Sequence, residues 1–247
     1  MDAFRIDGKK AVVTGGGSGL GLAIAKVFTK AGADVTIIGR NEEKLKAARQ
    51  ETGGNCTYKA FDVTRLQDIP ALVEETGAAD ILVNCAGIHL KKWALDVTDG
   101  EFAGVLNTHV MSVFALCREY GKLMTERKSG SIILISSMTA VMGMKQVVAY
   151  TTAKSAILGL QRSLVAELSA DGVRVNTIAP GWIDTPMLHK AIEADAPRKA
   201  KILDRIPTHT FGDPEDIGYA ALYLSSPAGK YVNGVFLPVD AGAAEAF

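Results

Sequence analysis

Short runs of apolar residues alternate along this chain with longer segments whose apolar residues recur every three or four positions. The short runs are apolar at nearly every position, as in strands that are buried on both faces of a parallel sheet. Strands are therefore predicted over residues 11–13, 35–38, 81–83, 132–135, 173–178 and 235–237. The longer segments predict helices over residues 20–30, 42–51, 66–75, 101–126, 153–169 and 214–224.

Strands and helices that alternate in this way are typical of an α/β fold with a doubly wound parallel sheet. No repeat, low-complexity stretch or polar linker divides the chain, so a single domain over residues 1–247 is predicted. The segment at about 187–211 fits no strand and holds two prolines, and we expect it to be an insertion that forms a lid. Ligands of doubly wound folds bind beyond the carboxyl ends of the strands.

The charge and composition of the chain argue against several classes of binding partner. The 27 Lys and Arg residues balance 27 Asp and Glu residues, which argues against general electrostatic binding to nucleic acid or to an anionic membrane. The charge-free run over residues 129–144 is shorter than the ~20 apolar residues of a membrane helix. The three cysteines offer neither a disulfide framework nor a metal-ligand spacing, so we expect no metal and a reducing, cytoplasmic location.

A glycine-rich turn follows the first predicted strand and precedes a helix. Glycines let the backbone turn sharply and approach a pyrophosphate, and the helix N-terminus offers free N–H groups. A purely structural turn is the alternative, but the position between strand and helix favours dinucleotide binding. The candidate residues of this turn are Gly15, Gly17, Ser18, Gly19, Leu20 and Gly21.

The chain resembles the short-chain dehydrogenase/reductase family of about 250 residues. The family's motifs occur in order between residues 9 and 240: Thr14-Gly15-x-x-x-Gly19-x-Gly21, Asp62-Val63, Asn84-Cys85-Ala86-Gly87, Ser137, Tyr150-x-x-x-Lys154, Asn176, Pro180 to Thr185 and Tyr231 to Gly234. The resemblance implies a Rossmann-type sheet with helices on both faces. It also implies hydride transfer between a nicotinamide cofactor and a secondary alcohol or ketone.

Tyr150 and Lys154 are four positions apart, so they lie on one face of a helix. We expect the Lys154 ammonium to lower the phenol pKa from its ordinary ~10 toward neutrality. The resemblance implies that Tyr150 is the general acid/base, that Ser137 holds the substrate oxygen, and that Lys154 also binds the nicotinamide ribose.

The resemblance also implies a set of residues that line the dinucleotide. On the adenine and ribose side they are Asp62, Val63, Asn84, Ala86 and Gly87. On the nicotinamide side they are Pro180, Gly181, Ile183 and Thr185.

The end of the second strand indicates which dinucleotide is used. Gly39 stands where an NAD enzyme of the family usually carries Asp, and Arg40 follows it. A guanidinium suits a 2′-phosphate, so NADP is predicted, with NAD as the alternative. Ser18 stands where many NADP-using relatives carry a second base.

One position departs from the family pattern. The family usually has Asn in the helix after the Asn-Ala-Gly motif, where its main-chain carbonyl anchors a water linked to the catalytic Lys. Alignment places His109 there, and a slipped register would place Asn107 there instead. His109 is thus a candidate catalytic residue whose ordinary pKa of ~6.5 lies in the working range. A core histidine without a role is the third alternative.

The sequence indicates less about the substrate than about the fold or the cofactor. The lid has more basic than acidic residues, and Lys91-Lys92 resembles the paired bases of the gluconate 5-dehydrogenase branch, so a sugar acid is one hypothesis. Trp93 and several methionines favour the alternative, a 3-oxoacyl thioester or another apolar ketone. A non-catalytic dinucleotide sensor is a further alternative. The resemblance also implies a homotetramer built on helices 101–126 and 153–169.

Overall fold

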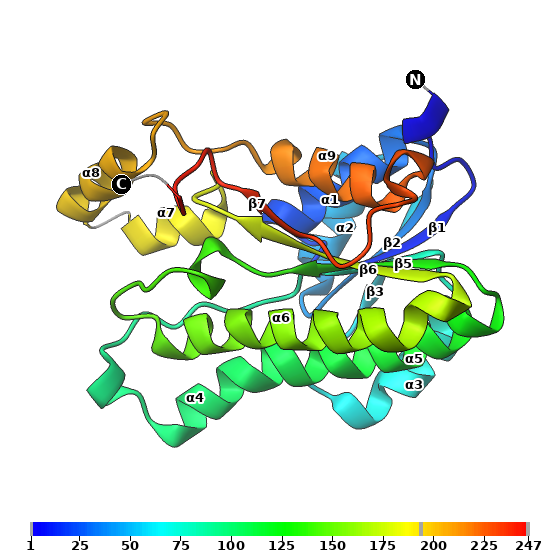
Figure 1. Cartoon of the computed structure of the whole chain (residues 1–247), viewed down its shortest axis with the longest axis horizontal. Helices are drawn as coiled ribbons and strands as arrows, with labels where there is room; N and C mark the ends of the chain where they lie inside the picture. Colours follow the sequence, from blue (N-terminus) through cyan, green and yellow to red (C-terminus); the bar gives the residue numbers. More distant parts are fainter. Residues whose placement is uncertain (1, 193–194, 246–247) are drawn as a thin grey trace.

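Seven parallel strands form the centre of the molecule in a computed structural model that describes residues 2–192 and 195–245 (Figure 1). The strands follow the spatial order β3-β2-β1-β4-β5-β6-β7. Their bounds are β1 Lys10–Thr14, β2 Asp34–Gly39, β3 Cys56–Ala60, β4 Ile81–Asn84, β5 Gly130–Ile135, β6 Val173–Pro180 and β7 Phe236–Val239. The single α/β domain with a doubly wound sheet is therefore confirmed.

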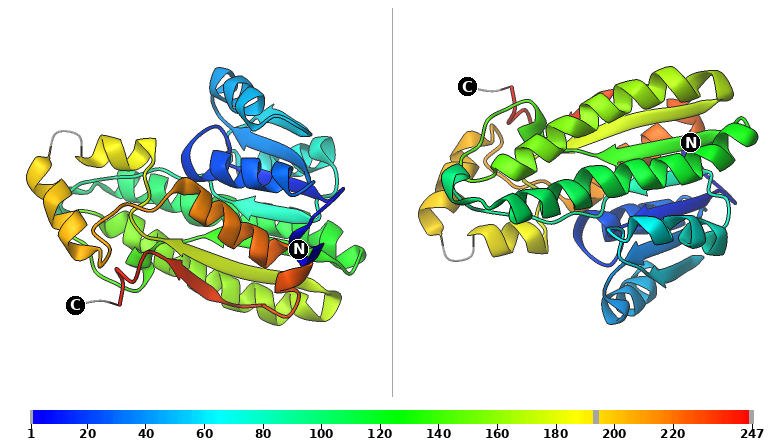
Figure 2. Two further views of the ribbon diagram at one scale, coloured as in Figure 1. Left: turned by 90° about the horizontal axis from the view of Figure 1, so that it is seen from above. Right: turned by 90° about the horizontal axis from the view of Figure 1, so that it is seen from below.

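Helices cover both faces of the sheet, and the helix pairs α1 with α9 and α5 with α6 lie side by side (Figures 1 and 2). The helices are α1 Gly19–Lys30, α2 Glu42–Thr52, α3 Ile69–Thr76, α4 Asp99–Leu106, α5 Ser112–Glu126, α6 Val148–Leu168, α7 Pro186–Ile192, α8 Ala196–Arg205 and α9 Pro214–Ser225. Alternate strand residues enter opposite cores: Val13 packs with α1 and α9, whereas Val12 packs with α3 and α5. Both faces are thus apolar, as the unbroken hydrophobic runs predict.

The structure adds to or differs from the sequence prediction at several elements. Strand β3 lies at the edge of the sheet and buries only Cys56 fully, so it lacks the apolar run of the inner strands. The segment 187–211 contains α7 and α8. The predicted helix 101–126 is divided by a π-helical turn, Asn107–Met111, which separates α4 from α5.

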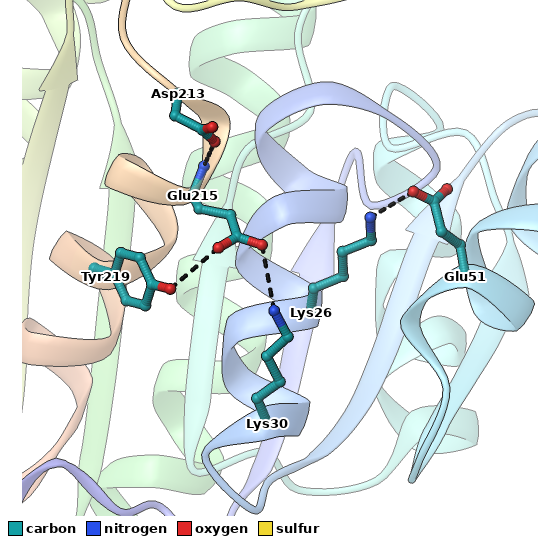
Figure 3. Close-up of polar contacts among 6 residues, drawn as sticks. All are labelled: Lys26, Lys30, Glu51, Asp213, Glu215 and Tyr219. Atoms are coloured by element: carbon teal, nitrogen blue, oxygen red, sulfur yellow. Dashed lines mark hydrogen bonds and ion pairs between the residues drawn. The ribbon is translucent and has the colours of Figure 1, made fainter.

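Polar contacts on the surface connect α1 to its two neighbouring helices (Figure 3). Lys26 forms an ion pair with Glu51 of α2, and Lys30 lies 3.3 Å from the Glu215 carboxylate at the start of α9. The Tyr219 hydroxyl donates to the same carboxylate over 3.1 Å. Exposed pairs of this kind stabilise little, so the apolar faces hold these helices on the sheet. No helix in the described part of the chain is long and apolar enough to cross a membrane.

Candidate active site

Two adjoining clefts open at the carboxyl ends of the strands. The first, which we call the turn cleft, is lined by the glycine-rich turn, the end of β2 and the Asp62 loop. The second, the tyrosine cleft, is lined by Ser137, Tyr150 and the lid. Gly87 lines both, so one extended ligand can occupy the two clefts together.

The glycine-rich turn is compact because side chains have no room in it. Gly15 has a φ of +72°, and a Cβ there would lie 2.9 Å from the Ala86 Cα. A Cβ on Gly21 would lie 2.4 Å from the Gly15 carbonyl oxygen. Ser18 precedes α1 without capping it through its hydroxyl, which leaves the first N–H groups of the helix available to a phosphate.

Most predicted dinucleotide residues line a cleft. The turn cleft is lined by Gly15, Gly17, Ser18, Arg40, Asp62, Val63, Ala86 and Gly87. The tyrosine cleft is lined by Leu20, Pro180, Gly181, Ile183 and Thr185 in addition to Gly87. Gly19 and Gly21 belong to the turn but are not among the described residues that line either cleft, so their contact with the dinucleotide stays a prediction.

The Asn84 side chain lies apart from the two clefts, and its role toward the dinucleotide stays a prediction. It is 4% exposed and lines neither cleft in the described part of the chain. Its amide donates to the Cys117 Sγ of α5 over 3.4 Å. Residues two apart on a strand share a face, so Asn84 points with Leu82 toward α5 and away from the clefts.

Two basic side chains lie at the end of the turn cleft. Arg40 follows β2, and Lys44, which the sequence analysis missed, comes from the first turn of α2. In the sequence, the spacing of four residues between Arg40 and Lys44 could have indicated this second base. Burial raises the pKa of Asp62, but hydrogen bonds from Thr64 and the charge of Arg40 outweigh burial and leave that pKa below its ordinary value.

The structure brings Ser137, Tyr150 and Lys154 together in the tyrosine cleft. Helix α6 begins at Val148, five residues before the predicted start, and carries Tyr150 and Lys154 on neighbouring turns. The Lys154 ammonium donates to the Ile135 carbonyl at the end of β5 over 2.7 Å. The Ser136 hydroxyl donates to the Lys154 main-chain carbonyl over 2.9 Å. These two bonds fix α6 against the strand that leads to Ser137.

The pKa of Tyr150 differs from the expected direction. Enclosure in the cleft raises it to about 12, although the hydroxyl of Ser137 hydrogen bonds to the phenol and acts in the opposite direction. Burial also lowers the pKa of Lys154 to about 8. The ammonium lies 5.5 Å from the centre of the Tyr150 ring and is bound to a carbonyl. Desolvation therefore outweighs the attraction between the two charges.

His109 lies in the π-helical turn and lines the tyrosine cleft, whereas Asn107 lines neither of the two clefts formed by the described residues. The imidazole contacts the edge of Tyr150 at a centroid distance of 5.4 Å. Its Nε2 lies 3.0 Å from the Ile88 nitrogen and 2.8 Å from the Ile88 oxygen. Burial and the Lys154 charge lower the pKa of His109 to about 3, so it stays neutral in the working range, contrary to the titration considered above.

The outer wall of the tyrosine cleft comes from the lid and two loops. Its apolar side chains are Met138, Met144, Trp182, Met187, Leu188, Ile192 and Ile202. Its charged and polar contributors include Arg198 and His89. Lys91 and Lys92 are not among the described residues of the wall. Lys91 lies 3.3 Å from Asp195, and Lys92 binds Glu101, so each ammonium has an acidic partner.

No group of three or more potential metal ligands gathers anywhere in residues 2–192 and 195–245. The glycine-rich cradle, the helix N-terminus and the two bases of the turn cleft fit a phosphorylated dinucleotide instead.

The fold and the paired clefts define a dinucleotide-binding oxidoreductase, and comparison with known proteins supports this. A family profile described as enoyl-(acyl carrier protein) reductase matches residues 15–244. The chain is 40% identical over 248 residues to 2-dehydro-3-deoxy-D-gluconate 5-dehydrogenase of Bacillus subtilis (strain 168), covering 98% of this chain and 96% of the relative. The chain belongs to the short-chain dehydrogenase/reductase family.

Two further relatives show the range of this similarity. The chain is 36% identical over 244 residues to 3-oxoacyl-(acyl-carrier-protein) reductase of Chlamydia muridarum (strain MoPn / Nigg), covering 96% of this chain and 97% of the relative. A gluconate 5-dehydrogenase from Burkholderia cenocepacia J2315, solved in complex with NADP and tartrate, superposes with a TM-score of 0.94. It is 32% identical and matches 100% of this chain and 99% of its own.

The environment of His109 predicts how its variants behave. His109→Leu removes the bond to Ile88 and should lower kcat about tenfold, which corresponds to ~1.4 kcal/mol. His109→Asn should lose less, since an amide can still bond to the main chain. Because the imidazole stays neutral, the pH–rate profile of His109→Asn between pH 5 and 8 should keep the wild-type shape.

Asn107→Ala is the matched control and should keep at least half of the wild-type kcat. A large loss in Asn107→Ala beside an unchanged His109→Leu would move the role to Asn107. A displaced pH–rate profile in His109→Asn would show that the imidazole titrates.

Proposed function

We propose that this protein is an NADP-preferring dehydrogenase that moves a hydride between the cofactor and a secondary alcohol or ketone of the sugar acid and polyol class. The observation that carries the proposal is the convergence of Ser137, Tyr150 and Lys154 in one cleft beside a dinucleotide cradle. The relatives named above include dehydrogenases of gluconate derivatives, which supports a polyhydroxylated substrate.

Ser137, Tyr150 and Lys154 have different roles in proton transfer. The Ser137 hydroxyl holds the reacting oxygen of the substrate, and Tyr150 exchanges a proton with the same oxygen. When bound, the cofactor would supply the hydride chemistry, as the acceptor in its oxidised form and as the donor in its reduced form. The positive charge of the oxidised form would favour the phenolate of Tyr150 and oppose the raised pKa of this side chain. Lys154 acts on Tyr150 electrostatically and offers its remaining donors to the cofactor ribose.

His109 is a positioning residue in this proposal. Its ring packs on Gly87, where a Cβ would lie 2.5 Å from the imidazole Cε1, and it bonds to Ile88. It therefore holds the loop that lines both clefts and supports the edge of Tyr150.

The preference for NADP rests on Arg40 and Lys44. Both line the turn cleft near Asp62, and both can bind a 2′-phosphate, the guanidinium with two parallel hydrogen bonds. Gly39 supplies no carboxylate to the 2′-hydroxyl of NAD at this position.

A 3-oxoacyl thioester reductase is the second candidate, and the apolar wall of the tyrosine cleft favours it. Trp93, in contrast, is 54% exposed and is not among the described residues of that wall. The dinucleotide sensor is the least supported, because the set of Ser137, Tyr150 and Lys154 is intact.

The assembly and location form part of the same proposal. Met111, at the end of the π-helical turn, and Phe114 of α5 are 47% and 43% exposed, and such apolar side chains suit a homotetramer built on α5 and α6. Cys56, Cys85 and Cys117 are free thiols, as suits a cytoplasmic protein.

Replacement of the phenol hydroxyl tests the activity. Tyr150→Phe keeps the ring but removes the transferable proton, so kcat should fall ~10²–10⁴-fold while NADPH binding measured by fluorescence stays near wild type. A Tyr150→Phe enzyme with more than half of the wild-type kcat would contradict the mechanism.

A pair of basic variants tests the cofactor. Arg40→Ala and Lys44→Ala should each raise the KM for NADPH about tenfold and leave the KM for NADH within twofold, because only NADPH carries the 2′-phosphate. Lys46→Ala is the matched control: Lys46 lies on α2 and forms ion pairs with Glu42 and Glu43. Equal effects on both cofactors would show that these bases do not bind the 2′-phosphate.

A further inference from the structure

Helix α8 carries a guanidinium into the tyrosine cleft. Arg198 is half-buried and lines the cleft together with Tyr150 and His89. The centroid of the His89 ring lies 5.5 Å from that of Tyr150. Enclosure of its ring, then the charges of Arg198 and Lys91, lower the pKa of His89.

Neighbouring polar groups fix where Arg198 points. Asp195 precedes α8, and its carboxylate accepts from the Arg198 main-chain nitrogen over 3.1 Å. The other carboxylate oxygen lies 3.3 Å from the Lys91 ammonium. The Arg198 guanidinium donates to the Gln146 Oε1 over 3.4 Å. Helix α8 is thus attached to the loop after β4 and to the loop before α6.

The Arg198 guanidinium forms no direct ion pair with any residue in the described ranges. The charge of Arg198 does act on Asp195, but both oxygens of that carboxylate are hydrogen bonded to other groups, so a ligand carboxylate can pair with the guanidinium directly. The remainder of the cleft wall is mostly apolar. A guanidinium in such surroundings binds a carboxylate more strongly than one in open water.

We propose that Arg198 binds the carboxylate of an acid substrate whose reacting carbinol lies at Tyr150, and that the Lys91–Asp195 pair positions Arg198 for this. The proposal rests on the proposed function and assigns its substrate to the acids, not to neutral polyols or thioesters. His89 lines the same cleft and can offer a hydrogen bond to a substrate hydroxyl. Lys91 therefore acts through α8 and not on the substrate.

The test compares an acid with its uncharged amide. Wild-type enzyme, Arg198→Met, Arg198→Lys and the control Lys199→Met are assayed with NADP, D-gluconate and D-gluconamide, and with shorter aldonates and their amides. Lys199 is an exposed cation of the same helix. Wild type should favour the acid, and Arg198→Met should lower kcat/KM for the acid ~10–100-fold while leaving the amide within twofold. Arg198→Lys should restore part of the preference, and Lys199→Met should match wild type.

A second variant pair separates the roles of Arg198 and Lys91. Asp195→Asn keeps a capping oxygen for α8 but removes the charge that holds Lys91. It and Lys91→Ala should each reduce the preference for the acid less than Arg198→Met does. A loss in Lys91→Ala as large as that in Arg198→Met would assign the carboxylate to Lys91 instead.

The failure of this inference is distinct from the failure of the proposed function. NADPH binding by each variant confirms that it folds. Equal kcat/KM for acid and amide in wild type, or equal loss on both in Arg198→Met, would overturn the role of Arg198 alone. Absence of turnover with every acid, amide and polyol would overturn the dehydrogenase itself and this inference with it.

Discussion

The site depends on one buried charge, the Lys154 ammonium, and on the carbonyl that receives it. Lys154 is 6% exposed, and its Nζ lies 2.7 Å from the Ile135 oxygen at the end of β5. A buried ammonium without such a partner is costly, so this bond constrains where α6 can lie. The Ser136 hydroxyl completes the attachment by donating to the main chain of Lys154. Tyr150 on α6 and Ser137 after β5 meet as a consequence.

The same burial sets the electrostatics of the site. It keeps His109 neutral, lowers the pKa of Lys154 to about 8 and raises that of Tyr150 to about 12. The resting phenol is therefore protonated, as suits proton donation to a ketone. Oxidation of an alcohol needs the phenolate, which positive charge in the cleft favours. The protein thus supplies a pre-arranged but uncharged tyrosine.

The sequence predicted the inner strands of the sheet better than its edge strand. Inner strands such as β5 bury nearly every residue and leave a clear apolar run, whereas the edge strand β3 does not. The cleft-lining residues of contiguous motifs could be named from the sequence because turns and helix spacing fix them locally. Lys44 was missed, and Arg198 could not be told apart from the other basic residues of the lid, because their proximity to the clefts depends on how α2 and α8 pack. The sequence motif alone does not show that the Asn84 side chain points toward α5.

The most direct test of this account is the pKa of Lys154 in the intact protein. NMR titration of protein labelled with ¹³C at the lysine ε-carbons, with the signal assigned by its loss in Lys154→Met, measures it without turnover. The account predicts a midpoint near the pKa of about 8 to which burial lowers this group. A midpoint at the ordinary lysine value of ~10.4 would show that the ammonium is solvated and would contradict the account.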